Sequence, residues 1–414
     1  MDLFSLSLAL LQRYPYPFYS VARRFRPVVN VSQYKLWLVF GYDDTKRVLT
    51  EHATFSSDFG RMAGADALQD PQMRAALISS DPPVHTKLRG LVTRAFTARA
   101  VSSLEPRIES LTHGMLDRVI ETGRMDLIDD LAYPLPVVVI SEMLGIPAKD
   151  RDQFRQWSDQ VVRSANNLFG DRKDMQAGDG GGGLVTAEME PYLLDIIERR
   201  RRVPGDDLIS GLVAAEIDGE CLTESDLMSF CSLLLVAGNV TTTNLIGNTM
   251  LTLLQHPQAL ARLQDDLSLL PAAIEEGLRY RSPVQFMFRI TTRAVELGGH
   301  TLQPGQIVLA FIGSANRDEA RFPAAHRFDL DREPNPHIAF GHGIHYCLGA
   351  PLARLEGRLA LTILLTRLRD IRRANLRPLP PGEAMILHGV RHLPLIFNPG
   401  PRLGATTPEM ELAI

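Results

Sequence analysis

Cysteine is scarce in this chain. Among its 414 residues only Cys221, Cys231 and Cys347 occur, and their spacing matches neither a set of disulfides nor a zinc finger. A sparse, odd set of this kind favours a reducing compartment, where thiols stay free or bind a metal. We therefore expect a cytoplasmic protein without a disulfide framework.

The chain has no strong excess of charge of one sign. The net charge is −4, and no long run of Lys and Arg occurs, so a nucleic-acid partner is not expected. A signal peptide is also missing, because the apolar run 1–11 has no leading positive charge and is followed by Pro15 and Pro17. The run is too short to span a bilayer, and we interpret it as a docking arm of a soluble protein.

Long apolar segments without polar side chains are absent too. The segment 227–255 has no charged residue, and hydropathy alone would allow a membrane span. Thr223 and Asp226 form the sequence of a capping box before it, and His256-Pro257 ends it, which predicts roughly 32 helical residues and a length of ~48 Å. We favour a helix buried inside a large protein over a membrane span, because lipid disfavours the polar side chains of Asn239, Thr241, Thr242, Thr243, Asn244 and Asn248.

Apolar residues make up 45% of the chain and charged residues 22%, which suits a large globular core. Helical patterns dominate residues 83–273, and another helix is predicted at about 348–368. A small hairpin is predicted from Val28–Val31 and Leu36–Phe40. We therefore expect a mainly α fold with a minor β region, in one domain over 1–414. Glycines at 178 and 180–183 mark a loop that is either a surface linker or a lid.

The run FGHGIHYCLG at residues 340–349 carries the strongest chemical signal. Its glycines allow tight turns and a close approach of the backbone to a flat ligand, and Cys347 stands just before a predicted helix, whose N–H groups favour a thiolate. This run resembles the haem-binding loop of the cytochrome P450 superfamily, of the soluble bacterial type. The resemblance implies haem b (iron protoporphyrin IX) with Cys347 as its iron ligand, and contacts from Phe340 and Gly341. It also implies that haem lies between the long distal helix and the proximal helix after the cysteine loop.

Further motifs of that family follow in the expected order, so the resemblance covers nearly the whole chain. Glu276 and Arg279 stand three residues apart, as in the family's Glu-x-x-Arg pair, and can join in a charge-assisted pair on one helix. Arg327 resembles the third member of this ionic network, whose role is to brace the proximal face.

A set of basic residues resembles the family's partners of the haem propionates. His85 and Arg89 are four residues apart, so one face of a helix presents two donors to an anion. The resemblance adds Arg289 and His345 to this set. The alternative, which the pair alone would favour without haem, is that His85 and Arg89 lie on a solvent-exposed basic face of the helix.

The segment from Ala237 to Thr242 resembles the family's oxygen-activating stretch. Ala237 and Gly238 are small and leave room for dioxygen, and Thr241 matches the catalytic threonine. The family usually has an acid at the position just before this threonine, where this chain has Val240, which cannot relay protons. Three routes stay open: water held by Thr241, Thr242 and Asn239, a polar group on the substrate, or a reaction that depends less on the relay.

Family resemblance also places the substrate contacts, and they are mostly apolar. They predict a hydrophobic substrate, and the residues are Ile78, Leu233, Val236, Val284, Phe286, Ile386 and Leu387.

We therefore predict a monooxygenase that hydroxylates or epoxidises a hydrophobic small molecule with O2. Electrons would come from a separate ferredoxin or flavodoxin and its reductase, which could meet Lys87, Arg354 and Arg358 near Cys347. Two alternatives are a non-hydroxylating oxidation, such as desaturation or ring coupling, and a haem-binding sensor without turnover.

Overall fold

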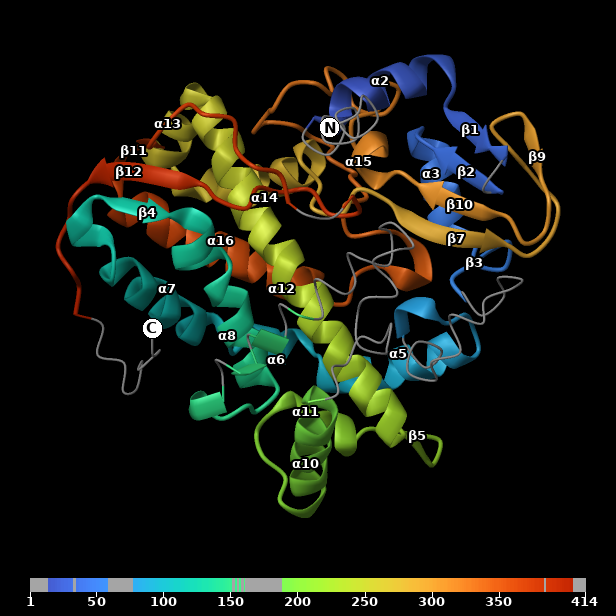
Figure 1. Cartoon of the computed structure of the whole chain (residues 1–414), viewed down its shortest axis with the longest axis horizontal. Coiled ribbons are helices and arrows are strands. Elements are labelled where there is room, and N and C mark those ends of the chain that lie inside the picture. Colours follow the sequence, from blue (N-terminus) through green and yellow to red (C-terminus); the bar gives the residue numbers. More distant parts are fainter. Residues whose placement is uncertain are drawn as a thin grey trace.

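The computed structural model describes residues 14–32, 35–58, 77–150, 188–382 and 385–404, together with 153–154, 156–157 and 160. Helices dominate these residues and a smaller part is sheet, as predicted (Figure 1). The apolar run 1–11 and the glycine loop 178–183 lie outside the described residues.

Several of the α-helices pack around one long central helix, α12 (Glu224–Gln255). In chain order they are α2 (Pro15–Phe25), α3 (Tyr42–Thr50), α5 (Val84–Ala95), α6 (Ala98–Ser102), α7 (Glu105–Asp117), α8 (Pro134–Met143), α10 (Met189–Arg202), α11 (Leu208–Val213), α12 (Glu224–Gln255), α13 (Pro257–Asp265), α14 (Leu270–Tyr280), α15 (Ile312–Ala315) and α16 (Ala350–Arg367). Short 3-10 or π turns are η4 (Leu77–Ser79), η5 (Ile120–Thr122), η6 (Ile128–Ala132), η7 (Ala148–Asp150), η9 (Leu267–Leu269) and η10 (Gly343–His345).

The strands form two sheets and two small hairpins. The five-stranded sheet has the order β1 (Val28–Val31), β2 (Leu36–Val39), β10 (Ile307–Ala310), β7 (Met287–Thr291) and β3 (Phe55–Ser56). The three-stranded sheet has the order β11 (Arg369–Arg373), β12 (Pro394–Asn398) and β4 (Arg124–Asp126). The hairpins pair β5 (Glu216–Ile217) with β6 (Glu220–Cys221), and β8 (Val295–Leu297) with β9 (His300–Leu302).

The predicted hairpin near the N-terminus is confirmed. Strands β1 and β2 pair antiparallel, with Val28 opposite Val39 and Val31 opposite Leu36. Strand β10 extends this hairpin by pairing with β2 in parallel, and β7 follows antiparallel. The sheet packs its buried side chains against α3 and α15, and this makes a second core beside the helical one.

Helix α12 has the length and the start that the sequence predicts. The Thr223 hydroxyl accepts from the Asp226 N–H at 3.1 Å, and the Asp226 carboxylate accepts from the Thr223 N–H at 2.9 Å, which completes the capping box. Among the described residues it is the one helix long and apolar enough to cross a membrane, but 65% of its most apolar window is buried inside the protein.

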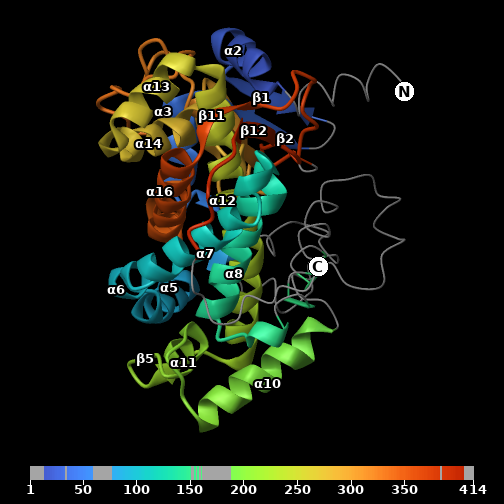
Figure 2. The same cartoon turned by 90° about the vertical axis from the view of Figure 1, so that its left-hand side faces the viewer.

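The surroundings of α12 explain this burial. Helices α8, α14 and α16 pack against it, and the larger apolar core gathers around them. Figure 1 shows α12 crossing the molecule with α16 beside it, and Figure 2 shows the same helix from the side, running from the top of the molecule to its lower part. The predicted buried position of this helix is therefore confirmed. The organisation of the chain as one domain stays a prediction.

Candidate active site

An internal cavity of about 260 Å³ lies between α12 and the loop that carries Cys347. Ala237, Gly238 and Thr241 of α12 line it, and Cys347 lines it from the facing loop. The predicted distal and proximal segments therefore meet in one cavity. Most of the remaining wall is apolar and includes Leu77, Phe96, Ile140, Met143, Phe230, Leu233, Leu234, Val284, Met287, Ala339 and Leu352.

The cysteine loop owes its path to two glycines. Gly341 and Gly343 both have φ of +75°, a left-handed conformation that favours glycine. A Cβ on Gly343 would also lie 3.1 Å from the Leu49 carbonyl oxygen, so the loop packs directly on the end of α3. The Cys347 N–H donates to the Phe340 carbonyl at 2.9 Å and closes the loop just before α16. These contacts place the sulfur at the cavity wall.

The Cys347 thiol responds to two opposing effects. Burial raises its pKa, and this is the larger effect. The N–H groups of Gly349 and Ala350, with the positive charges of Arg89 and Arg354, lower the pKa. The helix start thus acts on the sulfur as expected, but burial outweighs it. A bound metal ion would remove the thiol proton, since a coordinating thiol is deprotonated.

A buried ion pair braces the proximal side of the cavity. Arg279 is fully buried, and its guanidinium donates to both carboxylate oxygens of Glu276 at 2.7 and 2.8 Å. Its other N–H groups donate to the carbonyls of Asn316, Ala325 and Arg327, each at 2.9 Å. All five donors of this guanidinium therefore have acceptors. The predicted pair is present.

The predicted third member of this network is wrong. The Arg327 side chain is exposed, and only its backbone carbonyl reaches Arg279. The guanidinium that joins Glu276 belongs to Arg332, with its Nε at 3.1 and 3.2 Å from the carboxylate oxygens, and Asn335 donates to the same carboxylate at 3.2 Å. Both lie in an irregular loop, where spacing along the chain does not determine which side chain turns inward.

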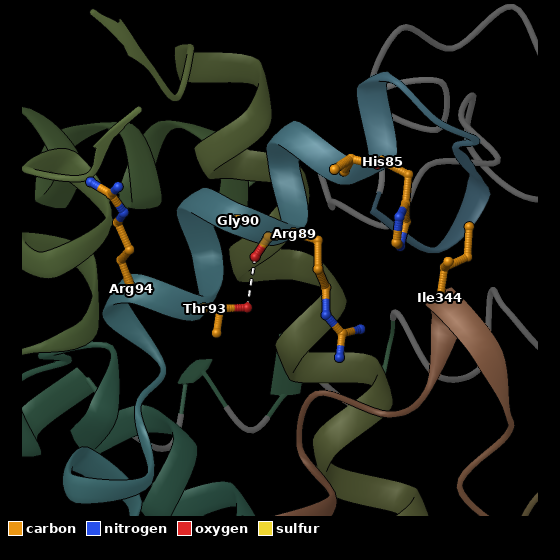
Figure 3. A pocket seen from close by; sticks show the side chains of 7 residues that line it. His85, Arg89, Gly90, Thr93, Arg94 and Ile344 are labelled. Atoms are coloured by element: carbon orange, nitrogen blue, oxygen red, sulfur yellow. Dashed lines mark hydrogen bonds between the residues drawn. The ribbon is translucent and has the colours of Figure 1, made fainter. Parts of the chain in front are cut away.

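Basic side chains gather at one edge of the cavity. Arg89, Arg289 and His345 line it, and the ring of His85 lies 4.3 Å from the ring of His345. Figure 3 shows His85 and Arg89 one turn apart on α5, in a surface hollow of about 490 Å³ whose opposite wall is Ile344. The four predicted propionate partners are therefore brought together.

Two of these edge donors, His85 and Arg289, are buried, and several of their polar atoms are poorly satisfied. Within the described residues, Nε2 of His85 and Nε2 of His345 have no hydrogen-bond partner. Arg289 is 3% exposed, and the hydrogen bond found for its guanidinium is to the Phe288 carbonyl at 2.7 Å. Burial lowers the pKa of Arg289 to about 10 and also lowers the pKa of His85. An anion at this edge would accept hydrogen bonds from these donors. It would also raise the lowered pKa values of Arg289 and His85, because a negative charge favours their charged forms.

The residues of the cavity fit the expected haem. A sulfur ligand faces a small-residue stretch of α12, apolar walls suit a flat macrocycle, and unsatisfied basic donors stand where two carboxylates would need partners. Thr241 donates its hydroxyl proton to the Ala237 carbonyl at 2.5 Å, which leaves its oxygen lone pairs as acceptors. Gly238 packs closely on α8, since a Cβ there would lie 2.4 Å from Ile140.

The predicted substrate contacts separate into three groups. Ile78, Leu233 and Val284 line the cavity, whereas the side chain of Val236 lies outside the described part. Phe286 does not line the cavity and packs against Phe288 and Phe311, with ring centroids 5.4 and 5.1 Å away.

Ile386 and Leu387 form the third group. They do not line the cavity but pair with the segment that does: the Ile386 carbonyl accepts from the Gln285 N–H, and Leu387 forms a bridge with Val284. Sequence reasoning missed Ile140, Met143 and Met287, which do line the cavity. The apolar run from Leu135 to Ile140 in α8 was the available signal for Ile140, whereas Met143 follows the polar Ser141 and Glu142.

The cations expected to meet a redox partner already have partners inside the chain. Lys87 pairs with Glu220, and Arg358 pairs with Glu105 at 2.7 Å. Arg354 donates to both oxygens of Glu275 at 2.7 and 2.8 Å. A partner protein would therefore have to compete with these carboxylates, so the electrostatic part of the expected docking is weaker than the sequence suggested.

Comparison with known proteins agrees with this geometry. A family model described as cytochrome P450 matches residues 4–371. The cytochrome P450 monooxygenase PikC of Streptomyces venezuelae is 40% identical over 405 residues, which cover 95% of this chain and 93% of that protein. The cyclomarin C epoxidase CymV of Salinispora arenicola is 42% identical over 354 residues, covering 84% and 87%.

A solved structure has the same fold. The structure of CYP109E1 from Bacillus megaterium in complex with corticosterone superimposes with a TM-score of 0.83 at 40% identity, and covers 94% of this chain and 99% of that one. Fold, family model and relatives agree over nearly the whole chain. The chain therefore belongs to the cytochrome P450 family and is a cytochrome P450 monooxygenase.

Proposed function

We propose that this enzyme inserts an oxygen atom from O2 into a hydrophobic small molecule, by hydroxylation or epoxidation. Membership of the family implies a haem cofactor and the use of O2 and redox partners. The observation that carries the proposal is the cavity, which Cys347 and Thr241 both line within mostly apolar walls, with basic side chains at one edge. Haem, when bound there, supplies the iron that activates O2.

Each group of site residues has a role in this proposal. Cys347 would hold the iron, with Phe340 and Gly341 beside it in the cavity wall. The edge donors, His85, Arg89, Arg289 and His345, would hold the propionates. The chain has no Cys-x-x-Cys-His sequence for covalent attachment, which favours haem b held by these contacts.

The substrate class follows from the wall. Ile140, Met143 and Val284 offer apolar surface, and methionine adapts to irregular shapes. The related CYP109E1 has been solved with corticosterone, a hydrophobic molecule, and CymV is named an epoxidase. We extend this class, and both types of oxygen insertion, to the present chain. A separate ferredoxin or flavodoxin with its reductase would supply the electrons.

A second function, oxidation without oxygen insertion, is favoured by one residue. Val240 stands beside Thr241 on α12 and can neither donate nor accept a proton. Thr241 and Thr242 both line the cavity and can hold water, and this is the proton route we propose for oxygen insertion. Desaturation or ring coupling would place less demand on that route.

Spectroscopy and product analysis test the proposal. Binding of CO to the reduced protein should give the red-shifted absorption band of thiolate-ligated haem, and Cys347→His should abolish that band while haem still binds. A screen of hydrophobic compounds should then find ligands that shift the iron spin state.

Products decide between the functions. A gain of one oxygen atom supports the first proposal, and a loss of two hydrogens supports the second. A loaded protein that shows neither a spin shift nor reductant-driven product would instead be a haem-binding sensor.

A further inference from the structure

One stripe of α12 continues past the cavity with polar side chains. Ala237, Thr241, Asn244 and Asn248 follow the spacing i, i+4, i+7 and i+11, which places them on one side of the helix. The first two line the cavity, whereas Asn244 and Asn248 are buried beyond it, 8% and 2% exposed. Neither asparagine has a role in the function proposed above.

Asn248 joins three segments that are far apart in sequence. Its amide nitrogen donates to the His388 carbonyl at 2.8 Å and to the Arg281 carbonyl, at the end of α14, at 3.2 Å. Only the NH2 group of an asparagine can meet two carbonyl oxygens, so these acceptors determine the orientation of the amide. The bond to His388 is buried and the bond to Arg281 is partly buried, so breaking them removes donors that solvent replaces poorly.

The loop that Asn248 holds is joined in turn to the cavity wall. The His388 N–H donates to the Pro283 carbonyl at 2.8 Å, and the Gln285 N–H donates to the Ile386 carbonyl at 2.8 Å. The segment 283–287 thus forms a short ladder with the segment 386–388. Pro283, Val284 and Met287 of that segment line the cavity. A contact at Asn248 is therefore only two steps from the surface that would touch a substrate.

A close approach at Asn244 completes the attachment. A Cβ built on Gly389 would lie 1.9 Å from the Asn244 side-chain oxygen, so the loop lies directly on this asparagine and a larger residue would push the two apart. On the outer side, the His388 ring meets the Tyr16 ring at 5.5 Å, and the Tyr19 hydroxyl donates to the Gln285 side chain at 3.1 Å. The wall segment is held between α12 and α2.

We propose that Asn244 and Asn248 are positioning residues that set the place of the wall segment 283–287, and thereby the size of substrate the cavity accepts. This inference rests on the proposed function, because it assumes that haem and substrate occupy this cavity. It assigns to two buried side chains, which do not touch the cavity, a part in selectivity.

Binding of two probes of different size to the haem-loaded protein tests the inference. Imidazole reports access to the iron alone, whereas the phenyl ring of phenylimidazole also reaches the wall. In Asn248→Leu the wall segment should move outward, and the ratio of the two dissociation constants should change about fivefold in favour of phenylimidazole, a size expected for the loss of buried hydrogen bonds. Imidazole affinity should stay within about twofold.

Two further variants keep the result interpretable. Gly389→Ala pushes the loop away from Asn244 by a different route and should change the ratio in the same direction. Thr252→Val removes a buried hydroxyl whose one hydrogen bond among the described residues goes to the Asn248 backbone carbonyl, at 2.7 Å on the same helix, and should leave the ratio unchanged.

The outcomes separate the inference from the proposed function. A lowered melting temperature with an unchanged ratio in both Asn248→Leu and Gly389→Ala would show a purely structural role and overturn the inference. If the loaded wild-type protein binds neither probe at its iron, the proposed function fails, and the inference fails with it.

Discussion

Two buried arginines of this protein differ in how well they are satisfied. Arg279 is fully buried on α14, and each of its five donors has an acceptor within the chain. Arg289, on β7, is 3% exposed, and its one hydrogen bond found in the described residues goes to the Phe288 carbonyl. Burial lowers the pKa of Arg289 to about 10, whereas Arg279 has its carboxylate beside it.

The difference distinguishes a charge that the chain itself satisfies, which stabilises the fold, from a charge whose donors are left for a ligand. Desolvating a cation is costly unless partners replace the lost water. At Arg279 the chain itself supplies them, so the pair braces the fold with or without cofactor. At Arg289 one carbonyl bond and the charge of Asp81 are what the described residues supply, and Nε2 of His85 and of His345 nearby have no partner there, which is the arrangement that an anion from outside the chain would complete. The predictions below test this contrast.

The largest effect is expected from Arg279→Leu. The change leaves the buried Glu276 carboxylate without its main partner and should lower the free energy of unfolding by about 3–5 kcal/mol, measured by urea denaturation of the haem-free protein. Arg262→Leu is the control, because Arg262 makes a similar two-bond pair with Asp331 on the surface, and its loss should stay below about 1 kcal/mol. Equal losses would contradict the assignment of a brace.

Arg289→Leu should have the opposite signature. Haem affinity should fall about 10- to 100-fold with the loss of charge-assisted bonds, while the haem-free protein should be as stable or more stable. Titration of apoprotein with haem and urea denaturation measure the two quantities. Arg317→Leu is the control: the Arg317 guanidinium is half-buried between the rings of Tyr16 and Tyr280, at 4.0 and 3.6 Å from their centroids, and its loss should lower stability but leave haem affinity unchanged.

The corrected third member of the brace gives a smaller contrast. Arg332→Gln removes a buried partner of Glu276 and should lower the free energy of unfolding by about 1–3 kcal/mol. Arg327→Gln should change it by less than about 0.5 kcal/mol, since that side chain is exposed. The reverse order would restore Arg327 to the network. Thermal or urea unfolding of both variants is sufficient.

The pH dependence of stability sharpens the contrast at the cavity edge. Burial and the nearby Arg89 lower the pKa of His85, so its folded value lies below its ordinary value of about 6.5. As the pH falls below about 6.5, the unfolded chain takes up the proton first, and the haem-free protein loses at most about 1.4 kcal/mol per pH unit until the folded pKa is reached.

The variant His85→Gln should lack this part of the slope, whereas His326→Gln, at an exposed site, should keep the wild-type slope. Haem should flatten the slope in the wild type, because a propionate beside His85 favours its charged form. A slope that is the same in all four samples would show that His85 does not titrate against stability.

The smallest effect is expected on the distal side, at Val240. If proton delivery limits turnover, Val240→Glu should raise the fraction of consumed electrons that appears in product by about two- to tenfold, a modest share of what a positioned acid can contribute. The control is Val240→Gln, which has the same size but relays no proton. Unchanged coupling with glutamate would mean that the natural route bypasses this position.

Local motifs were predicted well because short spacing leaves little freedom. Glu276 and Arg279 stand within one helical turn, and the capping box of α12 spans three residues, so their geometry follows from the helix itself. The cysteine loop is similar, since its glycines and the start of α16 set the path of Cys347. Family resemblance supplied the remaining members of the basic edge. Arg289 and His345 are far from His85 in sequence, so no local spacing predicts that they lie near it.

What the sequence determined by itself was the fold class, the path of the loop that carries Cys347 and the helices that enclose it, because periodicity and ten-residue motifs act over short distances. The tertiary structure alone decided that Arg332 takes the place expected for Arg327, that Phe286 packs away from the cavity, and that Asn248 reaches a loop 140 residues further on. Those choices depend on how loops pack against α12 and α14. Packing joins residues that no spacing along the chain relates.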